Sequence, residues 1–134
     1  MRQCFLIMLF AVIAHTAASQ AIYLFSDDDQ YLGCYNCNQY DTDAVCNEYG
    51  NYGSSYSTDS IWNEYGNYGS SYSSYSPWNE YSSSGPKMVD GNGNFYGRFS
   101  INTYAGFNQS SELRDLYNRV NGDLEILRNF ICNN

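Results

Sequence analysis

A 16-residue repeat in the middle of this chain constrains its fold more than any other feature. Residues 43–57, DAVCNEYGNYGSSYS, recur as residues 59–73, DSIWNEYGNYGSSYS, and a shorter copy, PWNEY, follows at the same shift. Repetition of one aromatic and polar unit builds a stacked scaffold or an extended surface more readily than a catalytic site. The shift brings Cys46, Trp62 and Trp78 into register. We therefore expect this position to face inward, filled once by a disulfide and twice by an indole.

Each repeat, within about residues 43–84, predicts a short helical turn followed by a glycine bend. In the second copy, Asp59 or Ser60 can cap the turn, and Gly66 can end it in the left-handed conformation. A continuous helix is disfavoured, because each glycine costs about 1 kcal/mol relative to alanine. Serine, glycine and asparagine are common in disordered segments, whereas so many aromatic residues favour order.

The first residues have the pattern of a secretory signal peptide. Arg2 precedes the apolar run CFLIMLFAVIA at residues 4–14, and small residues follow. The run is shorter than the roughly 20 residues that span a bilayer. Cleavage after Ser19 or after Ala21 satisfies the small-residue rule. The sequence thus predicts a signal peptide at residues 1–19, an extracellular or periplasmic location, and no membrane span.

The remaining residues 20–134 have the length of a single, strongly acidic domain. Without Arg2, five basic residues face 14 acidic ones, a net charge of −9. Nucleic acids and anionic membranes require Lys and Arg, so neither is expected as a partner. The chain has 15 tyrosines and few aliphatic residues after the apolar run. Its core must be largely aromatic, and so small a core usually needs covalent staples.

Four cysteines, Cys34, Cys37, Cys46 and Cys132, are the disulfide candidates of the exported domain. They allow three connectivities. We favour Cys37–Cys46 with Cys34–Cys132, because a bridge to Cys132 would tie the C-terminal helix to the N-terminal segment. The Cys-x-x-Cys pair could instead serve redox chemistry or hold zinc. Its extended, turn-rich setting at residues 31–37 lacks the helix N-terminus that lowers a thiol pKa.

The other elements complete an α+β fold: a small disulfide-stapled domain with short helical-turn repeats, a β-hairpin and two C-terminal helices. Residues 21–25 predict a strand, and residues 87–102 a hairpin around an Asp-Gly and Asn-Gly turn. Apolar spacing predicts helices over residues 111–120 and 123–131. Asn108, in the loop before them, heads a glycosylation sequon that matters only in a eukaryotic source.

No metal or cofactor site is predicted. Residues 90–94, DGNGN, begin like an EF-hand loop, but Phe95 and Ile101 replace the required Gly and Glu. The acidic run at residues 27–29 is typical of a solvated turn. With two aspartates that follow the cysteine pair, it leaves weak calcium binding as an alternative.

Nucleophilic catalysis lacks its base in the exported domain. The only histidine, His15, lies within the predicted signal peptide, which excludes Ser-His-Asp and Cys-His sites after cleavage. A glycosidase needs only two carboxylates, so Glu48, Glu64 and Glu80 are formal candidates for a glycan hydrolase. Their identical positions in the repeat favour a structural role. We therefore expect a protein that is not an enzyme.

The repeats are better suited to binding. Tyr, Ser, Gly and Asn together are typical of adaptable recognition surfaces, and aromatic faces suit sugar rings. The sequence predicts an interaction or adhesion domain for an unidentified surface glycan or protein; the alternative is a structural, coat-like accessory protein. Alternatively, the two tryptophans and most repeat tyrosines form the core, which we favour for the tryptophans because the domain has few aliphatic residues. The binding candidates are Tyr49, Tyr52, Tyr56, Trp62, Tyr65, Tyr68, Tyr72 and Trp78.

Three motifs resemble a group of small exported, mostly bacterial proteins that are largely uncharacterised. They are YLGC with Asn-Cys at residues 31–37, the repeated NxYGxYGS, and VDGNGNFYG at residues 89–97. In some members of that group a similar module follows a secreted nuclease-like domain. The resemblance spans residues 24–101 and implies export and a shared module, not an activity. Other members often carry Lys in the repeats, where Ser55 and Ser71 make this chain more acidic.

Overall fold

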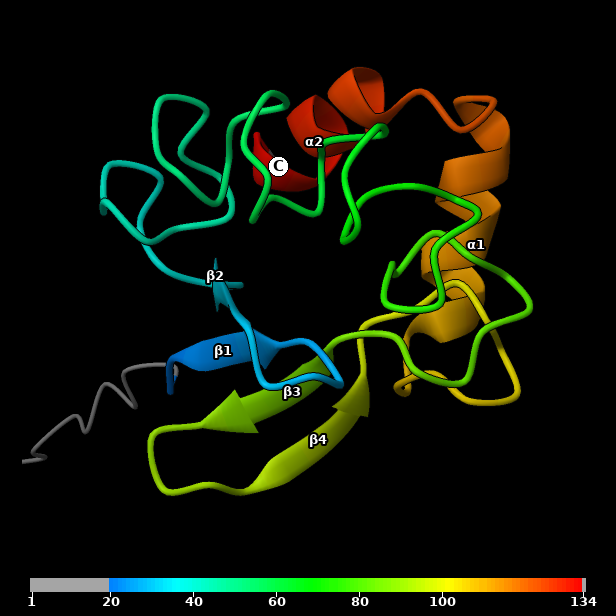
Figure 1. Cartoon of the computed structure of the whole chain (residues 1–134), viewed down its shortest axis with the longest axis horizontal. Coiled ribbons are helices and arrows are strands. Elements are labelled where there is room, and N and C mark those ends of the chain that lie inside the picture. The colour runs from blue at the N-terminus through cyan, green and yellow to red at the C-terminus, as the bar shows by residue number, and fades with distance from the viewer. Residues whose placement is uncertain (1–19, 134) are drawn as a thin grey trace, which may run out of the picture.

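The computed structural model of the chain describes residues 20–133, so the predicted signal peptide lies outside the described residues. The fold is α+β: a four-stranded antiparallel sheet, the repeat region and two helices (Figure 1). The sheet has the order β2-β1-β3-β4. Its strands are β1 (Ile22–Phe25), β2 (Tyr31–Cys34), β3 (Lys87–Asp90) and β4 (Phe95–Arg98), and the helices are α1 (Ser110–Arg119) and α2 (Leu124–Cys132).

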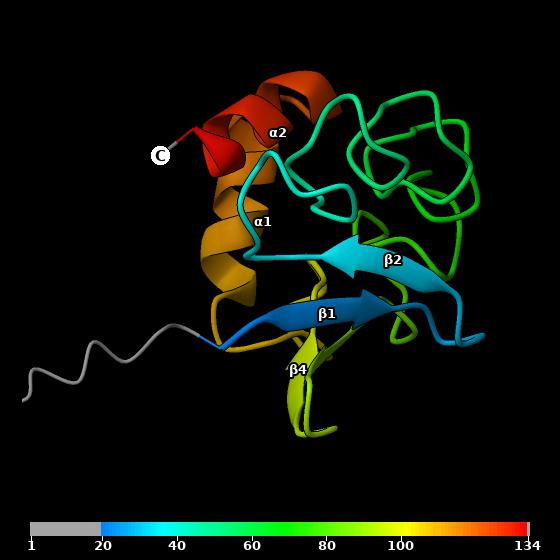
Figure 2. The ribbon, with the colours of Figure 1, turned by 90° about the vertical axis from the view of Figure 1, so that its left-hand side faces the viewer.

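The predicted hairpin and helices are confirmed to within a few residues, but the pairing of the sheet could not be predicted. β1 lies in the middle, with Tyr23 opposite Cys34 of β2 on one side and Val89 of β3 on the other. The repeat region therefore connects β2 and β3, which lie on opposite sides of β1. Figures 1 and 2 both place it above the sheet and beside the helices. No helix of residues 20–133 is long and apolar enough to cross a bilayer.

Asp90 organises the turn between β3 and β4. Its carboxylate accepts bonds from the backbone N–H of Asn92 (2.9 Å) and of Asn94 (3.0 Å). The Asn94 amide (2.9 Å) and the Tyr96 hydroxyl (2.7 Å) also donate to it. These bonds, that of the Asn94 side chain above all, lower the pKa of Asp90 from 3.8 to about 2. The residues that began like a calcium loop thus form a turn closed by their own aspartate.

We expect Asp90→Asn to destabilise the fold at neutral pH and to matter less in acid. A carboxylate whose pKa is lowered by folding contributes stability above its unfolded pKa, and this is lost as pH falls through the folded value of about 2. Urea midpoints of the native chain and the variant should differ at about pH 7 and converge toward about pH 2. Asp115→Asn, at an exposed position of α1, is the matched control. A difference that stays constant with pH would contradict this role of Asp90.

The repeats contain tight turns rather than helical ones. No helix or strand of the described chain falls between Cys34 and Lys87. Backbone N–H groups instead bond to the carbonyl three residues earlier, as in Asn63 to Ser60 (3.3 Å) and Gly66 to Asn63 (3.0 Å). The expected left-handed Gly66 is wrong, since its φ is not positive. Glycine is needed for close packing: a Cβ on Gly69 would lie 2.1 Å from the carbonyl oxygen of Asn63.

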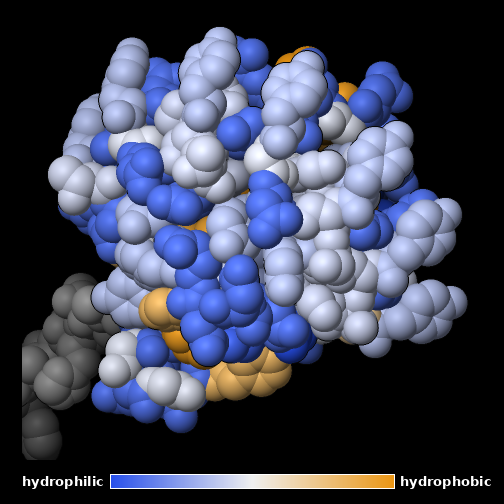
Figure 3. All heavy atoms as spheres, in the orientation of Figure 1, coloured by the Kyte–Doolittle hydropathy of each residue, from blue (hydrophilic) through white to orange (hydrophobic). Residues whose placement is uncertain are grey.

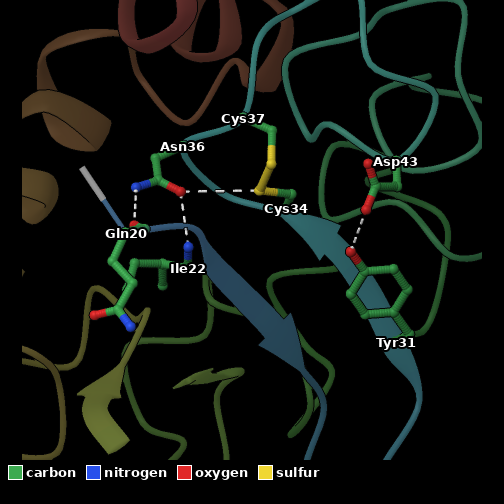
Figure 4. Close-up of a disulfide and its surroundings, with 7 residues drawn as sticks. All are labelled: Gln20, Ile22, Tyr31, Cys34, Asn36, Cys37 and Asp43. Atoms are coloured by element: carbon green, nitrogen blue, oxygen red, sulfur yellow. Dashed lines mark hydrogen bonds between the residues drawn. A yellow bond between two sulfur atoms is a disulfide. The ribbon is translucent and has the colours of Figure 1, made fainter. Parts of the chain in front are cut away.

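The two disulfides are Cys34–Cys37 and Cys46–Cys132, so the favoured pairing is wrong. After β2 the chain turns back at once, which brings the α-carbons of Cys34 and Cys37 to 5.5 Å (Figure 4). Asn36, between them, fixes this turn by accepting from the Ile22 N–H (2.8 Å). Cys132 meets the first repeat because α2 packs there, a long-range contact that the sequence pattern does not contain.

A stack of aromatic rings forms the centre of the core. Trp62 and Trp78, each 2% exposed, stack with their ring centroids 5.5 Å apart. Each indole N–H donates to the preceding repeat, that of Trp62 to the Val45 carbonyl (2.7 Å) and that of Trp78 to the Ile61 carbonyl (2.6 Å). The inward position of the repeat is thus confirmed for both tryptophans. One bond per indole fixes the register between successive repeats.

Candidate functional site

Six tyrosines of the repeat region stand almost entirely in solvent. They belong to two series with a spacing of 16 residues, one beginning at Tyr40 and the other at Tyr49. Their exposed fractions lie between 81% and 95%, although tyrosine usually buries much of its ring. Figure 3 shows rings projecting side by side along the upper and right-hand edges of the molecule. We call these six residues the outer tyrosines: Tyr40, Tyr49, Tyr56, Tyr65, Tyr72 and Tyr81.

A side-chain cap two residues earlier holds each outer tyrosine in place. The Asn63 side chain accepts from the Tyr65 N–H (3.1 Å), and its amide donates to the Ser57 carbonyl (3.0 Å). In the other series, the Ser70 hydroxyl accepts from the Tyr72 N–H (3.2 Å). Such Asx and ST turns replace the helical hydrogen bonds of these segments. The backbone beneath the exposed rings is therefore well ordered, and the same pattern recurs for Tyr40, Tyr49, Tyr56 and Tyr81.

The binding candidates that are not outer tyrosines are half-buried or buried. Tyr68 is 9% exposed, and its hydroxyl donates to Asp28 (3.2 Å). Burial first, and then the Asp28 charge, raises its pKa. Tyr52 is half-buried against Tyr31, whose hydroxyl donates to Asp43 (2.6 Å; Figure 4). Both predicted tryptophans lie in the core, so of the eight candidates the exposed ones are Tyr49, Tyr56, Tyr65 and Tyr72.

Among the clefts between the repeats and the C-terminal helices, three are lined by equivalent residues. Each contains an inward residue of the repeat, the following Asn-Glu-Tyr, and an outer tyrosine from each series. The first cleft faces the end of α2, the middle cleft faces the turn before α2, and the third faces α1. The chain direction of the helices is thus opposite to the order of the repeats. The inward residues of the three clefts are, in order, Cys46, Trp62 and Trp78.

The repeat glutamates differ in their partners. Glu48 pairs with Arg128 of α2 (3.4 Å), and Glu80 pairs with Arg114 of α1 (2.8 Å). Arg128 is only 7% exposed and also donates to the Gly53 carbonyl (3.1 Å). Two of the three formal catalytic carboxylates are therefore engaged in joining the repeats to the helices. Glu64 forms no ion pair with any Lys or Arg of residues 20–133.

Hydrogen bonds to two of these glutamates also raise the pKa of the neighbouring tyrosine phenols. A bond to Glu64 raises the pKa of Tyr65, and a bond to Glu80 raises that of Tyr81. Both phenols are thus neutral hydrogen-bond donors throughout the physiological pH range. Tyr65 and Tyr81 therefore each present an apolar face and a polar tip without adding negative charge.

The three aspartates between β1 and β2 form ion pairs and hydrogen bonds within the fold. Asp27 pairs with Arg98 (2.8 Å) and Asp29 with Lys87 (2.9 Å), and a bond from Ser26 lowers the pKa of Asp28. Among residues 20–133, no group of three or more His, Cys, Asp or Glu side chains is placed to hold a metal ion. The run therefore fastens the β1–β2 turn to the hairpin strands.

Sequence reasoning missed a further copy of the motif after the hairpin. Asn102 accepts from the Tyr104 N–H (3.1 Å), and its amide donates to the Ser82 carbonyl (2.9 Å). Tyr104 is 98% exposed. The motif Asn-x-Tyr alone would have found it, whereas a search for the full 16-residue unit fails because the hairpin interrupts the repeat. The sequon residue Asn108 is exposed in the loop that follows.

The comparisons with known proteins assign no family to this surface. No protein-family model, curated protein or solved structure matches the chain.

Proposed function

We propose that this chain is an exported, non-enzymatic interaction or adhesion domain whose outer tyrosines contact a carbohydrate or a surface protein. The supporting observation is the exposure of six phenol rings, 81–95% each, on turns that are individually capped. Aromatic rings left in water add nothing to the hydrophobic stability of the fold. Clusters of exposed apolar groups on a stable domain commonly mark interaction sites.

Tyrosine suits such a role for a physical reason. It offers a large amphipathic surface and has only two side-chain torsions to fix on binding, so the entropic cost of contact is low. The capped turns reduce that cost further, because the backbone is already ordered. The Asn, Ser and Glu side chains between the rings supply hydrogen-bonding groups that could orient a sugar or a peptide.

The test is a binding screen with matched variants. The purified chain is screened against cell-wall glycans, other carbohydrates and surface proteins, beside the variant with Tyr40, Tyr49, Tyr72 and Tyr81 changed to Ser. We expect at least one ligand to bind the native chain and to lose binding to the variant. Tyr104→Ser makes the same change outside the 16-residue repeats and should bind normally. No binding above background at high micromolar concentration, or equal binding by the fourfold variant, would refute the proposal.

The same exposed phenols favour a second candidate, a coat-like structural protein that is cross-linked through tyrosine. A peroxidase with hydrogen peroxide would take one electron and one proton from each of two phenols. The two rings then join through a carbon–carbon bond, and the peroxide is reduced to water. Dityrosine in native material, mapped to the outer tyrosines, would support this role. A native protein that is monomeric and free of dityrosine would eliminate it.

A further inference from the structure

The three equivalent clefts can be compared with one another, because the same repeat residues face a different part of the helices in each. Glu48 of the first cleft pairs with Arg128, which also lines that cleft, and Glu80 of the third cleft pairs with Arg114 of α1. The middle cleft faces Asn121 and Gly122, in the turn between α1 and α2, and no Lys or Arg of residues 20–133 lines it. In the repeats on either side, the glutamate at this position thus binds an arginine that a helix supplies.

We propose that the middle cleft binds an arginine side chain of a partner protein, with Glu64 as its carboxylate. This inference rests on the proposed function, because Tyr56 and Tyr65, two outer tyrosines, also line this cleft. The fold itself indicates this ligand, because the glutamate at the same position of the repeat binds a guanidinium on either side of the middle cleft. The middle cleft contains the equivalent glutamate and two outer tyrosines, so an arginine from outside would meet a carboxylate in the same repeat position.

The middle cleft has room for an arginine side chain, and its lining suits one. Its volume of about 760 Å³ exceeds the volumes of about 370 Å³ and 490 Å³ in the first and third clefts. Tyrosine rings beside a guanidinium provide cation–π attraction, for which arginine is the most frequent partner. The planar fork of arginine also matches a carboxylate better than the ammonium of lysine does.

The electrostatics of the middle cleft favour a cation despite the nearby helix end. Within the part of the chain that the structure describes, Glu64, Asp123 and Glu125 line it and no Lys or Arg does. The start of α2 contributes roughly half a positive charge. Asp123 already caps that end by accepting from the N–H groups of Glu125 (3.1 Å) and Ile126 (3.2 Å). Three carboxylates therefore outweigh the helix dipole.

The inference is tested by NMR titration of the purified, isotopically labelled chain with acetyl-Gly-Arg-Gly-amide. The matched probe contains citrulline, which keeps the shape of arginine but carries no charge. We expect a Kd on the order of 1 mM for the arginine peptide, since a single side chain is bound. Shift changes should centre on Glu64, Gly122 and Glu125. The citrulline peptide should bind at least about tenfold more weakly.

Variants then separate the cleft from the rest of the surface. Glu64→Gln should weaken arginine binding about tenfold or more, because a charge-assisted bond is lost. Glu112→Gln removes the same charge from an exposed position of α1 and should leave binding unchanged. Equal binding of the citrulline peptide, an unaffected Glu64→Gln variant, or shifts located elsewhere would each overturn the inference.

Failure of this inference can be told apart from failure of the proposed function. The fourfold tyrosine variant used above leaves Tyr56, Tyr65 and Glu64 in place, so it should still bind the arginine peptide. If the peptide fails to bind but the ligand screen succeeds, only the middle cleft has been misassigned. If the screen fails while the peptide binds, the cleft stands and the wider tyrosine surface does not.

Discussion

Replacing Trp78 with alanine is expected to destabilise the protein by about 3–5 kcal/mol. The ring is 2% exposed and lies within 5.5–5.8 Å, centroid to centroid, of Trp62, Phe99 and Tyr117. Its loss opens a cavity at the point where repeats, sheet and helix meet. It also leaves the Ile61 carbonyl without the indole bond of 2.6 Å. A small domain has a total stability of about 5–15 kcal/mol, so this change should remove a large fraction of it and lower the unfolding midpoint.

The control for Trp78 is another ring of the same repeat region. Tyr72 is 95% exposed, and Tyr72→Ala should change the free energy of unfolding by no more than about 0.5 kcal/mol. Urea denaturation followed by circular dichroism measures both variants. Comparable losses from the two changes would contradict the assignment of inner and outer positions in the repeat.

Removing the Cys46–Cys132 disulfide should have the second large effect. The bridge joins residues 86 apart, and the chain-entropy argument gives it about 4.5 kcal/mol. The Cys34–Cys37 bridge spans only three residues, and the same argument gives it about 2 kcal/mol. Cys46→Ala with Cys132→Ala should therefore lower the unfolding midpoint markedly and release α2 from the first repeat. A native midpoint for this double variant would refute the structural role of the long bridge.

Much of the fold could be predicted from local patterns. Leu113 and Leu116 belong to the apolar spacing that predicts the first helix, and Leu124, Leu127 and Ile131 to that of the second. The DGNGN turn predicts the hairpin. Each of these patterns depends on neighbouring residues alone. The alignment of Cys46 with Trp62 and Trp78 predicts the inside of the repeat. The β1–β3 pairing and the disulfide pairing involve residues far apart in sequence, where local periodicity carries no information.

The candidate surface could be predicted only in part, for a similar reason. Tyr65 and Tyr68 belong to the same repeat and look alike in sequence, yet one is 91% exposed and the other 9%. The difference arises because Tyr65 follows a capping Asn63, whereas Tyr68 reaches Asp28 in the distant β1–β2 turn. The equivalence of the three clefts also depends on helices more than 30 residues further along the chain.

Hydroxyl-radical footprinting with peptide mass spectrometry tests most directly the claim that each 16-residue repeat presents two tyrosines to solvent while its inward residues lie in the core. The reaction reports on side-chain exposure in the native chain. The account predicts fast oxidation of the outer tyrosines and slow oxidation of Tyr68, Trp62 and Trp78. Oxidation of Tyr68 as fast as that of Tyr65, or protection of Tyr65 and Tyr72 in the isolated protein, would contradict it.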